Sequence, residues 1–139
     1  MQILCLGISH RSALLEVRER FAVPDHELSA AVAQLARAPG VSEAVIVSTC
    51  NRVEYYVAAE DQLEGFAAVK EFIGTRINAP EGDTFARLQT AQSIRHLFRV
   101  VSGLESMVLG ETEILGQVKK AYASATEAGA TSRNLNKLF

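Results

Sequence analysis

Cysteine and proline are scarce in this chain of 139 residues, with two and three copies, and tryptophan is absent. Two cysteines, Cys5 and Cys50, are too few for a disulfide framework, so we expect both to be reduced. No apolar run approaches the roughly 18 residues that a membrane span needs. The apolar start breaks at Gly7 and lacks the basic lead of a secretory signal. These absences favour a cytoplasmic protein with no membrane partner.

Short motifs for nucleotides, metals and serine nucleophiles are also missing. The nine glycines form no Gly-x-Gly-x-x-Gly and no Gly-x-x-x-x-Gly-Lys segment. There is no Cys-x-x-Cys or His-x-x-x-His pair of the kind that holds structural zinc, and no Gly-x-Ser-x-Gly elbow. The sequence therefore predicts no metal site and no dinucleotide-binding turn.

Basic residues are slightly outnumbered by acidic ones, and the formal net charge is -2. Nonspecific nucleic-acid binding depends on clustered Lys and Arg, so an RNA partner must meet a local patch or another part of a longer protein. Apolar residues make up 48% and charged residues 22%, an ordinary balance for a globular domain.

Short apolar runs alternate with apolar residues at helical spacing. Strands are expected at 2–8, 41–48, 53–59 and 84–89. Helices are expected at 12–23, 25–37 and 61–76, with two more after Thr90. This order predicts an α+β fold with the ferredoxin-like split βαβ antiparallel sheet over residues 1–90. Residues 91–139 are expected to form a C-terminal helical appendage.

Cys50 is the most informative residue for chemistry. The two middle strands lie close enough in sequence to form a hairpin with residues 49–52 at its tip. A side chain there can reach solvent, and the nearby cation of Arg52 favours the reactive thiolate. By composition alone, an inert turn residue is the better interpretation. Cys5, within an apolar strand, is interpreted as a core residue.

Other polar residues allow both a structural and a functional interpretation. His96 lies in an amphipathic helical pattern and is either a general acid or base or a partly buried helix residue. His10, just after the first strand, is a second candidate base. Glu113 and Gln117 are four residues apart, so they share one helical face that could hold an amino group or simply be hydrated.

Three segments, in order along the chain, resemble the glutamyl-tRNA reductase family. Residues 7–13 with 17–20 resemble the family's opening, and Ser-Thr-Cys-Asn-Arg-Val-Glu at 48–54 resembles its catalytic cysteine segment. Residues 95–119, which include Ser-Gly-Leu-Glu-Ser-Met-Val-Leu-Gly-Glu-Thr-Glu, are similar to its longest signature.

The resemblance implies a reaction. The thiolate of Cys50 would attack the ester carbonyl of glutamyl-tRNA(Glu) and release the tRNA. Hydride from NADPH would then reduce the thioester to glutamate-1-semialdehyde, the precursor of 5-aminolevulinate and of tetrapyrroles such as porphyrins. A thioester divides one difficult reduction into acyl transfer and hydride transfer.

The resemblance also implies site residues. Thr49, Asn51 and Arg52 would join Cys50 in the substrate site, with Arg52 gripping the glutamate carboxylate. His96 matches the family's activity-linked histidine, as an acid-base or an orienting group. The remaining substrate-binding positions implied in this way are Ser106, Glu111, Thr112, Glu113 and Gln117. Residues 91–139 would thus complete the substrate site of a single catalytic domain.

Family members continue into an NADPH-binding domain and a helical dimerisation domain, and neither is recognisable here. We therefore expect this chain to be a piece of a longer homodimeric enzyme that binds NADPH elsewhere and could pass its product to glutamate-1-semialdehyde aminomutase. The alternative function is a noncatalytic ferredoxin-like module that binds a small ligand or a partner. A thiol redox sensor is less favoured, because no resolving cysteine lies on a plausible neighbouring loop.

Overall fold

The computed structural model describes residues 1–13, 15–76, 86–106 and 113–139. Its centre is a four-stranded sheet of β1 (Gln2–Ser9), β2 (Glu43–Ser48), β3 (Arg52–Ala59) and β4 (Ala86–Gln89). The strands lie in the order β2-β3-β1-β4, and every neighbouring pair is antiparallel. The predicted antiparallel sheet and its hairpin are confirmed. Residues 84 and 85 of the expected last strand lie outside the described part.

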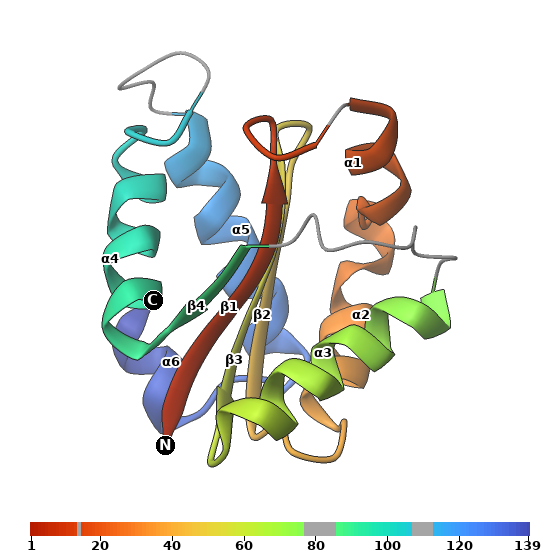
Figure 1. Ribbon diagram of the computed structural model, residues 1–139, viewed down its shortest axis with the longest axis vertical. Helices are drawn as coiled ribbons and strands as arrows, with labels where there is room; N and C mark the ends of the chain where they lie inside the picture. Colours follow the sequence, from red (N-terminus) through yellow and green to blue (C-terminus); the bar gives the residue numbers. More distant parts are fainter. Residues whose placement is uncertain (14, 77–85, 107–112) are drawn as a thin grey trace.

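Helices cover both faces of this sheet (Figure 1). On one face lie α1 (Leu15–Phe21) and α3 (Gln62–Arg76), while α2 (Asp25–Ala36) packs at the β2 edge, where it contacts β2, α3 and α5. On the other lie α4 (Thr90–Val101), α5 (Glu113–Glu127) and α6 (Arg133–Leu138). The segment expected to be an appendage therefore forms a complete layer. No helix in the described ranges is long and apolar enough to cross a membrane.

Strand β3 is buried along its whole length because both of its faces are covered. Successive side chains of a strand point to opposite faces. Tyr55 accordingly packs edge-on against Phe72 of α3, with ring centroids 6.1 Å apart. Tyr56 packs against Phe139 at the other face, at 5.4 Å. This alternation also places Arg52 and Glu54 on the face that α4–α6 cover.

Helix α6 was not expected from the sequence. Its first turn is stabilised by a residue far away in the chain, Glu43. The Glu43 carboxylate of β2 accepts hydrogen bonds from the backbone N–H groups of Ser132, Asn134 and Leu135, at 2.6, 3.1 and 2.9 Å. These are the donors that the first turn of a helix leaves unpaired. Burial alone would raise the pKa of Glu43, but the bonds outweigh it and the pKa is lowered.

We expect Glu43→Gln to lower the free energy of unfolding at pH 7 by about 2–3 kcal/mol, since a hydrogen bond to a charged group contributes about 1.5–3 kcal/mol. Because folding lowers this pKa, the stabilisation is complete above the unfolded value of about 4.3 and is lost as pH falls through the lower folded value. Urea unfolding at pH 7 and at decreasing acidic pH should show the difference shrink. Exposed Glu127→Gln is the matched control, and an equal loss there would contradict the role of Glu43.

Candidate active site

The hairpin tip between β2 and β3 presents Cys50 to solvent, as predicted. Thr49 fixes the turn, because its Oγ1 accepts from the backbone N–H groups of Asn51 (3.1 Å) and Arg52 (3.2 Å). Arg18 of α1 donates from Nη1 to the Cys50 carbonyl at 2.7 Å. The thiol is therefore exposed on a backbone that is held at several points.

His10 lies beside this tip, since its backbone N–H donates to the Asn51 carbonyl at 2.8 Å. Its Nδ1 is buried and has no hydrogen-bond partner among the described residues. Burial and the cations of Arg52, Arg11 and Arg18 lower the pKa of His10. A lowered pKa favours the neutral imidazole, which is the form that a general base needs.

Arg52 is a buried residue and not a surface charge of the tip: its side chain is 2% exposed. Its Nη1 donates to Glu54 Oε2 at 3.3 Å, and its Nη2 donates to the Glu105 carbonyl. A buried ion pair of this kind must be satisfied by further hydrogen bonds. Here Tyr56 provides one, donating to Glu54 Oε1 at 3.0 Å.

Glu54 is a central residue that the sequence interpretation missed. Besides Arg52 and Tyr56, it contacts His96 of α4, whose Nε2 pairs with Glu54 Oε2. The His96 side chain is 23% exposed, so it is a partly buried helix residue with a defined polar partner, and its role as a general acid or base stays a prediction. A carboxylate inside the apolar run 53–59 was the available signal, because an unexplained charge in a buried strand indicates a polar partner.

Glu105 is a second residue that was missed. It links three elements: Arg11 after β1 (2.9 Å), Arg99 of α4 (2.6 Å) and, through its carbonyl, Arg52 of β3. Burial opposes ionisation of Glu105, but the contacts with Arg99 and Arg11 lower its pKa overall. The segment that follows α4 is thereby tied to the sheet.

The other predicted site residues lie partly within the described structure. Ser106 donates its backbone N–H to the Gly103 carbonyl at 3.3 Å. Glu113 and Gln117 are both exposed on α5, one turn apart, whereas Glu111 and Thr112 lie outside the described residues. The hairpin tip, the turn after β1 and the start of α5 lie at the same end of the sheet (Figure 1).

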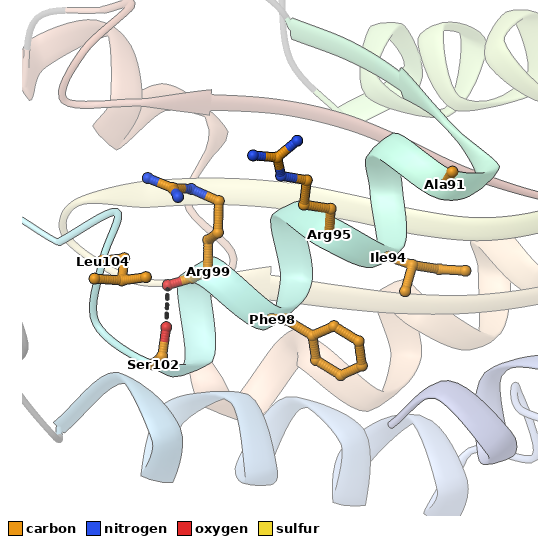
Figure 2. A pocket seen from close by; sticks show the side chains of 7 residues that line it. All are labelled: Ala91, Ile94, Arg95, Phe98, Arg99, Ser102 and Leu104. Atoms are coloured by element: carbon orange, nitrogen blue, oxygen red, sulfur yellow. Dashed lines mark hydrogen bonds between the residues drawn. The ribbon is translucent and has the colours of Figure 1, made fainter.

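Two hollows lie near these residues. A cavity of about 230 Å³ runs along β1 and is lined by Cys5, Arg11, Glu54, His96 and Glu105, among others. A separate hollow of about 500 Å³ is lined by residues of α4 and by Leu104. Figure 2 shows that Arg95 and Arg99 project to one side of α4 and Phe98 to the other. Cys50 lines neither hollow.

Cys50 and Cys5 are expected to react very differently with iodoacetamide. Cys50 is exposed, whereas Cys5 is 2% exposed and burial raises its pKa. Near neutral pH we expect one carbamidomethyl group on Cys50 and a second on Cys5 only in denaturant. Peptide mass spectrometry measures this, and modification of both thiols at equal rates in the native protein would contradict the described burial.

The chain is similar to known proteins over almost its whole length. The family model described as "Glutamyl-tRNAGlu reductase, N-terminal domain" matches residues 6–139. Glutamyl-tRNA reductases of Akkermansia muciniphila and Desulfatibacillum aliphaticivorans are 46% and 42% identical to all of this chain, which spans 42% and 33% of their lengths. The solved structure of glutamyl-tRNA reductase from Methanopyrus kandleri is 33% identical, with a TM-score of 0.78, over 98% of this chain and 31% of that one.

Proposed function

Starting from the fact that the chain belongs to the family of glutamyl-tRNAGlu reductase N-terminal domains, we propose that it transfers the glutamyl group of glutamyl-tRNA(Glu) to Cys50. The observation that carries this proposal is an exposed thiol on a fixed hairpin tip. The activity is that of a longer oxidoreductase, since the chain spans less than half of its curated relatives. Tetrapyrrole synthesis follows as its metabolic role.

The transfer is a thiol-for-alcohol exchange. The Cys50 thiolate attacks the ester carbonyl carbon, and the bond from that carbon to the ribose oxygen breaks. The ribose oxygen takes a proton, and the glutamyl group remains on sulfur as a thioester. His10, neutral and beside the tip, is suited to accept the thiol proton. His96, paired with Glu54, acts as an acid-base or orienting group.

The proposed substrate site combines the tip with the start of α5. Thr49 and Asn51 shape the turn, and Arg52 reads the glutamate carboxylate with its planar fork. The substrate carboxylate would replace the Glu105 carbonyl that Arg52 Nη2 now contacts. The further proposed contacts are Ser106, Glu111, Thr112, Glu113 and Gln117. The carboxylates of the two glutamates suit the substrate ammonium.

NADPH is not expected to bind to this chain. Binding of dinucleotides in the common fold uses a parallel sheet and a Gly-x-Gly-x-x-Gly turn, whereas this sheet is antiparallel and the motif is absent from the sequence. Reduction of the thioester therefore belongs to the longer protein. Its dimerisation, its cytoplasmic location and transfer of product to glutamate-1-semialdehyde aminomutase stay predictions.

We further assign the ferredoxin-like arrangement to the sheet. The order β2-β3-β1-β4, with antiparallel neighbours and a helical connection after β1 and after β3, supports this assignment. The third layer, α4–α6, is then an addition specific to this domain. The polar contacts between residues 1–90 and residues 91–139 support the proposal that the two parts form one catalytic domain.

This chain alone is expected to form the thioester and then release free glutamate slowly, because without a placed hydride donor the thioester is hydrolysed by water. Incubation with glutamyl-tRNA(Glu) at low salt, which strengthens phosphate contacts, should give a glutamyl adduct in the intact mass and glutamate in the supernatant. A small glutamate ester serves as a control that needs no tRNA contacts. NADPH oxidation coupled to semialdehyde formation by this chain alone would contradict the proposal that reduction of the thioester needs the longer protein.

A further inference from the structure

Three potential metal ligands of different kinds converge beneath α4. The Cys5 sulfur of β1, a Glu54 carboxylate oxygen of β3 and a His96 ring nitrogen of α4 all lie within 4.8 Å of one another. Zn²⁺ takes sulfur, oxygen and nitrogen ligands at about 2.0–2.3 Å, so tetrahedral ligands are roughly 3.3–3.8 Å apart. To share an ion, the Cys5 sulfur would move toward the other two groups by at most about 1.5 Å. Glu54 and His96, which now form a hydrogen bond with each other, would exchange that bond for bonds to the ion.

Cys5 has no part in the proposed acyl transfer, yet its surroundings are polar. Leu4 contacts the α3 face, where its Cδ1 lies against Gly65, so the alternation of β1 turns Cys5 to the α4 face. Gly7, on that face, leaves the space that Glu54 fills: a Cβ at Gly7 would lie 2.9 Å from Glu54 Cγ. The backbone thus brings a carboxylate to a buried thiol.

The surroundings are suited to hold and admit an ion. Arg52 and Tyr56 fix the two oxygens of Glu54, which corresponds to the outer hydrogen bonds that orient ligating carboxylates. The cavity of about 230 Å³ reaches Cys5, Glu54 and His96. Arg11, with a side chain 58% exposed, lines the same cavity and marks its connection to solvent.

We propose that Cys5, Glu54 and His96 form a binding site for a divalent ion of the zinc class, with a fourth position open to the cavity. On binding, the S–H bond of Cys5 breaks, its proton leaves to solvent and a metal–sulfur bond forms. Neither metal nor sulfur changes oxidation state. Mg²⁺ and Ca²⁺, which take oxygen ligands, are excluded by the sulfur and nitrogen donors.

A bound ion and the proposed reaction compete, because both use the side chains of Glu54 and His96.

The sequence could not reveal the site by the usual ligand spacings. Cys5, Glu54 and His96 stand on three separate elements, and the contact between Glu54 and His96 joins residues 42 apart. Only the register of β1 with β3 and the packing of α4 bring them together.

Cobalt titration tests the proposal without any assay of activity. Co²⁺ is added to the reduced Cys50→Ser chain, in which Cys5 is the remaining thiol, and the thiolate-to-cobalt charge-transfer absorption is followed. We expect one equivalent to bind with this absorption, Zn²⁺ to displace it and Mg²⁺ to have no effect. Absence of the thiolate absorption in this variant would overturn the proposal.

Two further variants assign the ligands. Cys5→Ala in the same background should abolish the absorption, with circular dichroism confirming the fold. His96→Gln, at a partly exposed position, should weaken cobalt binding at least about 10-fold, since even changes in the outer contacts of ligands cost 10–100-fold. Unchanged affinity in His96→Gln would overturn the proposal even if the Cys5 variant fails to fold.

Discussion

Replacement of Cys50 by serine is expected to abolish the glutamyl adduct while the fold is retained. A hydroxyl at neutral pH is a far weaker nucleophile than a thiolate. Cys50 is exposed, and the contact that holds it, from Arg18 to its backbone carbonyl, survives the change. The free energy of unfolding should therefore change by no more than about 0.5 kcal/mol. Intact mass spectrometry after incubation with glutamyl-tRNA(Glu) gives the result directly.

The matched control is Cys5→Ala, which removes the other thiol. Because Cys5 is buried between β3 and β4, this change should lower stability by about 1 kcal/mol and leave the adduct intact. The two variants thus separate loss of chemistry from loss of packing. Persistence of the adduct in Cys50→Ser, or its loss in folded Cys5→Ala, would show that the nucleophile is wrongly assigned.

Replacement of Arg52 by glutamine is expected to have the largest effect on stability, a loss of about 3–5 kcal/mol, because it leaves a buried carboxylate without its cation. Glu54 is 4% exposed in its side chain and depends on Arg52, Tyr56 and His96 for polar contacts. Arg52→Lys should recover part of the loss, since lysine keeps the charge but not the planar fork. Urea unfolding measures both variants, with exposed Arg20→Gln as the control.

A double-mutant cycle identifies the cause of that loss. If an unpaired charge is responsible, Arg52→Gln combined with Glu54→Gln should be more stable than Arg52→Gln alone. Additive losses would instead mean that the two side chains contribute independently. Adduct formation, measured at a temperature where Arg52→Gln is folded, then reports separately on glutamate recognition.

Short-range patterns in the sequence determined the positions of most strands and of one main helix. Apolar runs and turn residues predicted β1, the β2–β3 hairpin and α3 close to their observed bounds, because alternation and helical spacing depend on neighbours in the chain. The same reasoning placed Cys50 at an exposed tip and Cys5 in the core, which the structure confirms. The family resemblance was likewise carried by contiguous segments.

Contacts between residues distant in the chain were decided only by the tertiary structure. Glu43 caps α6 from 89 residues away, Arg52 reaches the Glu105 carbonyl across 53, and His96 meets Glu54 across 42. Each contact depends on strand register and on which helix covers which face, and neither is encoded in a local pattern. The sequence therefore determined where the strands lie and which thiol is exposed. Folding alone decided that Arg52 is buried, that Glu54 has three polar partners and that Cys5 lies close to Glu54 and His96.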